Sequence, residues 1–319
     1  MIEEGYLGKS GIKVSRLCFG CWQASKHWST FKEELFIEAV HCAVDNGINF
    51  FDTALAYGQG FSEQVLAKAL KGRRDKVVIA DKFPYNRASP KEIRKSLEES
   101  LRNLNTDYID LYQQHWPSPT VPLDDSIGEL LRLKEEGKIR AVGVSNFMEP
   151  EWEKVSKVSQ IDTLQPCYNL LWRSIEKWVL PFCIKEKISV IPYSPLCQGL
   201  LTYKYRSFND VPPDVRERNI FFSKERFLEV LRFLNILEEV ARKYNRTCGQ
   251  VALRWLIEQK GVLAPIVGMT KKEQVLENLA VFNFKLAKED LELLSEKSCG
   301  FSENVGPWDT LWNWHPCRS

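Results

Sequence analysis

Four side chains that can hold or transfer a proton stand just after short apolar stretches of the sequence. Asp52 ends one stretch and Tyr57 follows it, Lys82 comes after a second stretch, and His115 comes after a third. Each position taken alone has an ordinary explanation, such as helix capping for an aspartate or packing for a tyrosine. Their recurrence after three successive stretches favours a shared chemical function.

This combination suits the reduction of a carbonyl group, which needs a hydride on carbon and a proton on oxygen. Tyr57 can donate the proton, although the pKa of a free tyrosine is about 10. An ammonium group beside the phenol, here Lys82 held by Asp52, is expected to lower that pKa because it stabilises the phenolate. His115 can polarise the carbonyl group through a hydrogen bond to its oxygen.

Apolar, β-rich stretches alternate with amphipathic helical stretches along the chain. We expect strands at 17–19, 48–52, 76–80, 108–113, 140–144, 163–165, 189–193 and 262–268. We expect helices at 61–70, 90–104, 123–136, 150–159, 180–187, 226–244, 248–259 and 272–280, the last being the final regular helix, with an irregular section at 200–223. Ser89, Pro90 and Glu92 have the spacing of a capping box at the start of the second helix.

Eight repeated strand–helix units imply parallel strands joined by right-handed crossovers, which close into a (β/α)₈ TIM barrel. The alternative is an open doubly wound sheet, but the first strand is not followed by the G-x-G-x-x-G motif that such sheets use for dinucleotides. The segment 5–14 reads as an N-terminal β-hairpin that plugs the bottom of the barrel. Active sites of TIM barrels lie at the carboxyl ends of the strands, so the four side chains are expected in one pocket.

The composition is that of one globular domain spanning residues 1–319, with additional helices and loops at its C-terminal end. The formal net charge is +2 and the basic residues form no stripe, so a nucleic-acid partner is not expected. The N-terminus lacks a signal peptide, and no apolar run reaches the roughly 18 residues of a membrane span, which together predict a cytoplasmic protein without a membrane partner. Cys18 and Cys21 form a C-x-x-C without a second ligand pair, so we interpret them as buried structural thiols and expect no metal.

In a longer series of motifs the chain resembles the aldo-keto reductases along essentially its full length. The motifs are Phe51-Asp52-Thr53-Ala54, Tyr57-Gly58, Ser62-Glu63, Asp81-Lys82, His115, Gly143-Val144-Ser145-Asn146-Phe147, Gln165, Tyr168-Asn169, Tyr193-Ser194-Pro195-Leu196 and Gly199-Leu200-Leu201. The resemblance implies catalytic roles for Tyr57, Asp52, Lys82 and His115, with Tyr57 as the acid. It implies a reversible reduction of aldehydes or ketones to alcohols, with a small carbonyl or alcohol compound as substrate.

The resemblance also implies a nicotinamide cofactor held by residues after the later strands. They are Trp22, Ser145, Asn146, Gln165, Tyr193, Ser194, Pro195, Leu196, Gln198, Gly199, Lys204, Gly268, Thr270, Lys271, Lys272, Gln274 and Asn278. Thr270 is expected to cap the helix at 272–280, whose N-terminus favours anions. Lys271 and Lys272 then face a 2′-phosphate, which favours NADP(H), while NAD(H) remains the alternative because many relatives place Arg here and this chain does not.

Substrate choice is expected to depend on loops at the barrel mouth and on the tail from Gly300 to Ser319, which we expect to be ordered. Trp22, Trp116 and Trp308 are the candidate substrate residues, and aromatic walls favour apolar or stacked substrates. A different function remains open, because some relatives, such as the β-subunits of potassium channels, use this fold as a cofactor-binding regulatory subunit.

Overall fold

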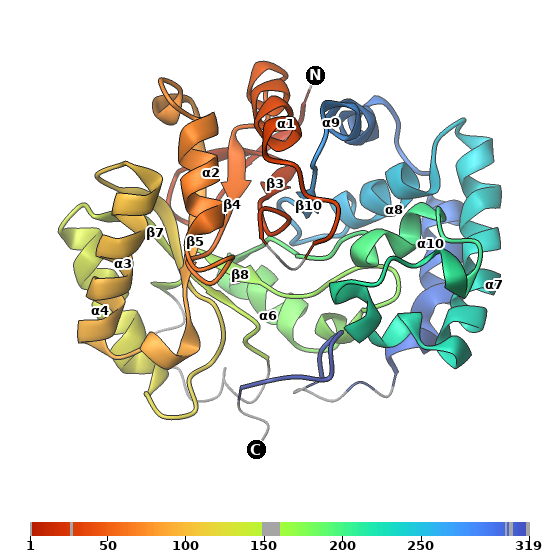
Figure 1. Cartoon of the computed structure of the whole chain (residues 1–319). Helices are drawn as coiled ribbons and strands as arrows, with labels where there is room; N and C mark the ends of the chain where they lie inside the picture. The colour runs from red at the N-terminus through yellow and green to blue at the C-terminus, as the bar shows by residue number, and fades with distance from the viewer. Residues whose placement is uncertain (1, 26–27, 149–159, 304, 306–308, 317–319) are drawn as a thin grey trace.

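Eight parallel strands form the centre of the molecule (Figure 1). The computed structural model describes residues 2–25, 28–148, 160–303, 305 and 309–316. The strands are β3 (Cys18–Gly20), β4 (Phe50–Asp52), β5 (Val78–Phe83), β6 (Ile109–Gln114), β7 (Ile139–Ser145), β8 (Thr163–Gln165), β9 (Ser189–Val190) and β10 (Ile266–Gly268). Their order in the sheet is β10-β3-β4-β5-β6-β7-β8-β9.

Backbone hydrogen bonds at the end of β9 and just after it close this sheet into a ring. The N–H of Leu263 donates to the carbonyl of Val190 at 2.8 Å, and the N–H of Ile266 donates to the carbonyl of Pro192 at 2.8 Å. The segment that leads into β10 therefore lies against the segment that leaves β9. The predicted (β/α)₈ barrel is confirmed, with one strand in each of the eight expected places.

Helices cover the outside of the barrel, with α1 to α4 along one side of Figure 1 and α7 to α10 along the other. Their bounds are α1 (Glu33–Asp45), α2 (Phe61–Ala69), α3 (Pro90–Leu104), α4 (Leu123–Glu135), α6 (Val179–Glu186), α7 (Lys224–Lys243), α8 (Cys248–Ile257), α9 (Lys272–Leu279) and α10 (Lys288–Ser298). The expectation that the helix at 272–280 is the last was wrong, because α10 follows it and packs against α7. The helix expected at 150–159 lies outside the described residues.

The N-terminal hairpin closes the bottom of the barrel as predicted. β1 (Glu4–Tyr6) pairs antiparallel with β2 (Lys13–Ser15). Leu7, Ile12 and Val14 belong to the same buried apolar cluster as side chains from inside the barrel, such as Leu111 and Ile191. This apolar plug leaves the opposite end, where the strands finish, as the open mouth.

Two local predictions about helix starts were wrong. Ser89 occupies the N-cap position of α3 with extended backbone angles, but its side chain accepts no capping hydrogen bond. The N-cap of α9 is Lys271 rather than Thr270, and it too lacks a side-chain cap. Thr270 instead uses its N–H and its hydroxyl to donate to Oε1 of Gln274, at 2.8 and 3.2 Å.

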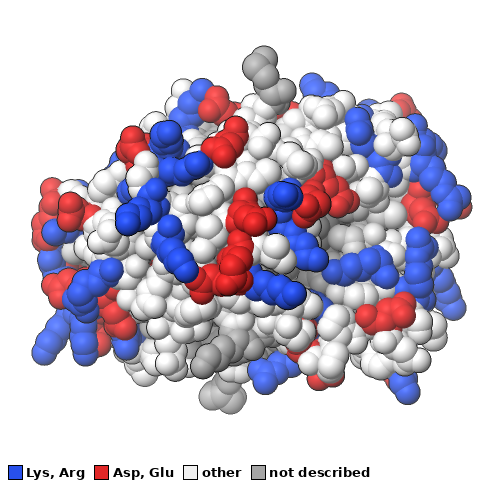
Figure 2. Space-filling view, turned by 45° about the horizontal axis from the view of Figure 1, so that its top comes forward, with Lys and Arg blue, Asp and Glu red and all other residues white. Residues whose placement is uncertain are grey.

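The positions of the two cysteines and of the charged side chains agree with the expectations from the sequence. Cys18 and Cys21 are free and fully buried, as expected. Figure 2 shows Lys and Arg intermixed with Asp and Glu over one face of the molecule. In the described part of the chain, no helix has both the length and the apolar composition that a membrane crossing requires.

Candidate active site

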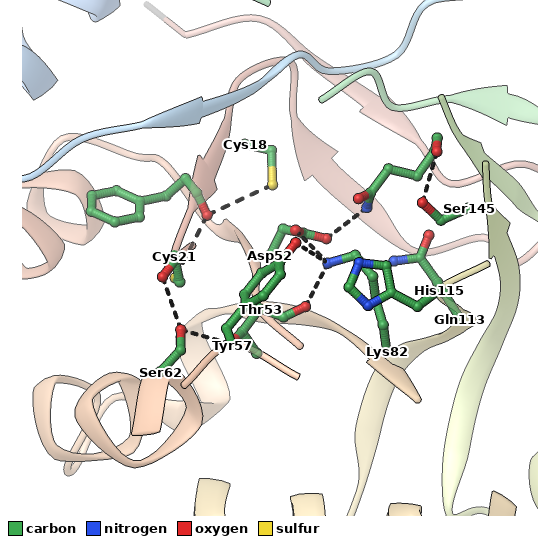
Figure 3. Close-up of polar contacts among 12 residues, drawn as sticks. Cys18, Cys21, Asp52, Thr53, Tyr57, Ser62, Lys82, Gln113, His115 and Ser145 are labelled. Atoms are coloured by element: carbon green, nitrogen blue, oxygen red, sulfur yellow. Dashed lines mark hydrogen bonds and ion pairs between the residues drawn. The ribbon is translucent and has the colours of Figure 1, made fainter. Parts of the chain in front are cut away.

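The ammonium group of Lys82 is the centre of a buried polar cluster at the barrel mouth (Figure 3). Its Nζ donates to Oδ1 of Asp52 at 2.7 Å, to the backbone carbonyl of Thr53 at 2.6 Å, and to the hydroxyl of Tyr57 at 3.3 Å. Both Lys82 and Asp52 are at most 2% exposed. Three acceptors therefore fix the ammonium group in one position.

The strand register explains why these side chains meet. β4 and β5 pair in parallel with Asp52 opposite Ala80, so Lys82 lies two residues further along on the neighbouring strand. Side chains two apart on a strand point to the same face, and here that face is the barrel interior. Gln165 on β8 donates its Nε2 to the second oxygen of Asp52 at 2.7 Å, from across the barrel. The sequence alone did not indicate this bond.

Burial is the main influence on the pKa of each group. It raises the pKa of Asp52, although Lys82 and two side-chain amides oppose the shift. Burial lowers the pKa of Lys82, but the charges of Asp52, Tyr57 and Asp81 and the hydrogen bond to Asp52 together outweigh this effect, and the net shift is upward. At neutral pH Lys82 is therefore protonated, and both oxygens of Asp52 accept hydrogen bonds, from Lys82 and Gln165, as those of a carboxylate do.

The pKa of Tyr57 was expected to fall because of Lys82, and that expectation was wrong. Burial raises it to about 12, and the ammonium group of Lys82 only partly offsets the rise. Burial, together with the charge of Lys82, holds the pKa of His115 well below its usual value. At neutral pH the phenol therefore carries its proton and the imidazole is neutral.

Tyr57 and His115 face each other across the mouth, their ring centroids 5.6 Å apart and nearly perpendicular. The His115 backbone is held on both sides, by the carbonyl of Phe83 at 3.0 Å and by Nδ2 of Asn146 at 3.0 Å. A cavity of about 570 Å³ opens in front of the two rings and of Asp52, while Lys82 stands behind them. This volume suits a small-molecule ligand.

Most of the residues expected to hold a cofactor line this cavity. They are Trp22, Ser145, Asn146, Gln165, Tyr193, Ser194, Pro195, Leu196, Gln198, Gly199, Lys204, Gly268, Thr270 and Gln274. Lys271 and Lys272 are exposed and do not line it, and Asn278 is buried within α9. The structure thus brings together residues from the ends of β7, β8 and β10 with the segment after β9.

Polar groups at the ends of β7 and β8 form a connected set. Asn146 has a left-handed backbone, with φ of 63°. Its Nδ2 donates to Oγ of Ser145 at 3.1 Å, and its Oδ1 accepts from the hydroxyl of Tyr193 at 2.8 Å. The set presents amide and hydroxyl groups beside the Tyr193 ring.

The segment after β9 approaches the cavity with backbone and positive charge. Gly199 has φ of +93°, and a Cβ there would lie 3.0 Å from Nζ of Lys204. Arg216 and Arg218, which the sequence analysis missed, also line the cavity. Arg216 is 5% exposed, lies over the ring of Trp28, and has a buried Nε without a hydrogen-bond partner in the described chain. Their position in an irregular loop explains why periodicity did not reveal them.

Aromatic side chains form the remaining wall of the cavity. The lining tryptophans are Trp22, Trp28, Trp116, Trp312 and Trp314, and Trp308 lies outside the described residues. Trp312 is nearly parallel to the Tyr193 ring, with centroids 6.0 Å apart, and it meets Trp22 edge to face at 5.7 Å. The C-terminal tail therefore contributes directly to the mouth of the pocket.

Comparison with known proteins identifies relatives of the whole chain. The model of the Aldo/keto reductase family matches residues 16–298. The chain is 36% identical over 322 residues to the aldo-keto reductase YhdN of Bacillus subtilis, covering 96% of this chain and 97% of that protein. It is 32% identical to an NADH-specific methylglyoxal reductase of Escherichia coli, with 91% and 96% covered. A crystal structure of an aldo-keto reductase from Klebsiella pneumoniae in complex with NADPH is 26% identical, with a TM-score of 0.76 and 93% and 95% of the two chains covered.

Proposed function

The chain belongs to the aldo/keto reductase family, whose members are NAD(P)H-dependent oxidoreductases acting on carbonyl groups, and we propose that Tyr57 is the residue that gives its proton to the carbonyl oxygen. The protein accordingly reduces small carbonyl compounds. Such a reduction places a hydride on the carbonyl carbon and a proton on its oxygen, and the reverse reaction returns both.

The cluster behind Tyr57 supports this assignment. The phenol carries its proton at neutral pH, as a proton donor must, because burial raises its pKa to about 12. Lys82 contacts the phenol oxygen at 3.3 Å and stabilises the phenolate that forms when the proton leaves. Asp52 holds Lys82 protonated and in place. A general acid positioned in this way contributes about 10²- to 10⁴-fold to the rate.

His115 is suited to orient the substrate. The neutral imidazole faces the Tyr57 ring and the cavity, so its N–H can donate to the carbonyl oxygen that receives the proton from Tyr57. A donor of fixed direction in a buried site stabilises the charge that develops on this oxygen.

The residues present fit a nicotinamide dinucleotide. The unpartnered Nε of Arg216 and the charge of Lys204 suit the diphosphate, and Gly199 provides backbone that no side chain covers. Tyr193 offers a ring face, and the amide groups of Asn146 and Gln165 suit a carboxamide. When bound, the nicotinamide supplies or accepts the hydride.

NADP(H) is the favoured cofactor, and NAD(H) is the alternative that one relative's name illustrates. We assign discrimination between the two to Lys271 and Lys272. Both are exposed at the start of α9, next to the pocket residues Thr270 and Gln274. A 2′-phosphate at this helix N-terminus would gain from the two positive charges.

The observation that carries the proposal is the 3.3 Å contact of a protonated, half-buried phenol with a buried ammonium group. We expect Tyr57→Phe to bind NADPH with nearly unchanged affinity in a tryptophan-quenching titration and to lose about 10²- to 10⁴-fold in turnover with aldehyde substrates. The matched control is Tyr6→Phe in the exposed hairpin, which should behave as the parent protein.

Full turnover by Tyr57→Phe would refute the assignment of the proton donor. A parent protein that binds NADPH but reduces no compound in a broad panel of aldehydes and ketones would instead support the regulatory-subunit interpretation.

A further inference from the structure

A pair of buried acidic side chains lies on the other face of β5, directly behind Lys82. Lys82 points into the barrel, so the preceding residue, Asp81, points outward toward the helices. There it meets Glu63, the third residue of α2. Both side chains are fully buried, with 0% exposure. The function described above does not use them.

Glu63 belongs to the structure that carries Tyr57. α2 begins immediately after the Tyr57 loop, and the N–H of Ser62 donates to the carbonyl of Tyr57 at 3.2 Å. Gly60 turns the loop with φ of +89°, and a Cβ there would lie 2.5 Å from Nδ2 of Asn103 and 3.3 Å from Oε2 of Glu63. The turn of the Tyr57 loop therefore rests on the Glu63 side chain and its partner.

Within the described chain, three of the four carboxyl oxygens of the pair lack a hydrogen bond of ordinary geometry. These are Oε1 of Glu63 and both oxygens of Asp81, which the Ser100 hydroxyl and, for Asp81, the backbone N–H of Lys82 only approach. Oε2 of Glu63 accepts from Nδ2 of Asn103 at 2.7 Å. Each carboxyl group acts on the pKa of the other as a hydrogen-bonding neighbour. Two carboxylates cannot bond, so the contact requires a proton on one of them.

The surroundings of the pair favour protonation of Glu63 over protonation of Asp81. Burial and then the charge of Asp81 raise the pKa of Glu63 to about 9. Burial also raises the pKa of Asp81, but the bond from Glu63 and the charge of Lys82 act against that rise. The titratable or charged groups around the pair are Lys82 on β5, Tyr112 on β6, Cys21 after β3, and Arg87, which acts on Tyr112.

We propose that Glu63 and Asp81 share one proton, and that this proton joins the helix after the Tyr57 loop to the strand that carries Lys82. The pair is then a positioning element for the proton donor, and this inference rests on the proposed role of Tyr57. Loss of the proton places two carboxylates side by side in a buried space, where their repulsion separates α2 from β5. The Tyr57 hydroxyl then moves away from Nζ of Lys82.

The proposal predicts that turnover falls at alkaline pH, and that the group whose deprotonation causes this fall is not Tyr57. Glu63 loses its proton near pH 9, whereas the pKa of Tyr57 is raised to about 12. In the parent protein kcat should therefore decline with an apparent pKa near 9. The decline should appear in kcat more than in KM, because the separation affects proton transfer rather than the walls of the pocket.

The test is the pH profile of kcat for Glu63→Gln. Glutamine can donate to Asp81 and cannot ionise, so it keeps the bond and removes the titration. We expect the alkaline limb to move upward by at least one pH unit in this variant. Glu98→Gln, which makes the same change at an exposed position of α3, is the matched control and should keep the parent limb.

A second readout uses the protein without cofactor. Infrared difference spectra should show a protonated carboxyl C=O band that disappears as the pH passes about 9 and is absent from Glu63→Gln. An unchanged alkaline limb in Glu63→Gln, or the absence of this band in the parent protein, would overturn the proposal. These failures are distinct from failure of the proposed function, which would appear as full activity of Tyr57→Phe.

Discussion

We expect the buried ion pair of Lys82 and Asp52 at the barrel mouth to affect both the stability of the fold and catalysis. Lys82→Met keeps much of the aliphatic side chain and removes the ammonium group. Asp52 is then left 2% exposed, with amide donors but without a positive charge. Removing one partner of a buried ion pair costs about 3–5 kcal/mol, because the other charge stays buried without compensation. We therefore expect the free energy of unfolding to fall by about this amount, together with turnover.

The measurement is equilibrium unfolding in urea, followed by the fluorescence of the ten tryptophans. The matched control is Lys68→Met, which removes an ammonium group at a similar distance from a carboxylate, 2.6 Å from that of Glu33. The Lys68 side chain is 66% exposed, and surface ion pairs contribute about 0–1 kcal/mol. The contrast between the two variants isolates the effect of burial.

A double variant and the pH dependence test the cause. Asp52→Asn in the Lys82→Met background removes the unpaired charge and should restore a large part of the lost stability. In the single variant the folded-state pKa of Asp52 rises further above its unfolded value, so the folded protein binds a proton that the unfolded chain lacks. Stability of Lys82→Met should therefore fall as the pH rises above about 4. A loss no larger than that of Lys68→Met, with no response to Asp52→Asn, would refute the reasoning.

Two further predictions concern the other charged groups. Glu63 binds a proton in the folded protein up to a pH of about 9, while the unfolded chain loses this proton near its usual pKa. As the pH rises through that window, the unfolding free energy of the parent should therefore fall relative to that of Glu63→Gln by up to about 1.4 kcal/mol per pH unit. Parallel plots of unfolding free energy against pH for the two proteins would contradict the raised pKa. Lys271→Ala and Lys272→Ala should each weaken NADPH binding by about 2- to 5-fold, as expected for exposed charges at a helix N-terminus, and leave NADH binding unchanged in the same fluorescence titration; equal weakening of both cofactors would exclude a 2′-phosphate contact.

The site was predictable from the sequence where regular strands position it. Strand periodicity places Lys82 on the same face of β5 as Ala80, two residues earlier, and the residue types place Asp52 at the end of β4. Arg216 could not be found in the same way, because it lies in an irregular loop that approaches the pocket only through tertiary packing. Helix α10 escaped the prediction because its buried residues include Asp290 and Ser298, which blur an apolar stripe.

The sequence also could not predict how the opposing effects of burial and of Lys82 on the pKa of Tyr57 would balance. Lys82 near Tyr57 indicated the sign of one effect on the pKa, and that effect is present. Its size relative to burial depends on how closely the barrel encloses the phenol, which no spacing of residues expresses. The missing capping bond of Ser89 is similar, because the residue has the right backbone position and only its hydroxyl fails to reach the N–H groups.

Asp81 and Lys82 are neighbours in the chain, so the side chains on the two faces of β5 are linked through the backbone. One peptide unit separates a carboxyl group that faces the helices from an ammonium group that faces the pocket, so a displacement of the strand moves both. On the helix side, Glu63 is joined to the Tyr57 loop by the same short segment of chain that forms the turn at Gly60. The phenol and the ammonium group are thus held together by a direct contact inside the barrel and, under our proposal, by a shared proton outside it. Two such constraints on one 3.3 Å contact explain why the barrel would keep the acidic pair of Glu63 and Asp81 buried, despite the cost of burying it.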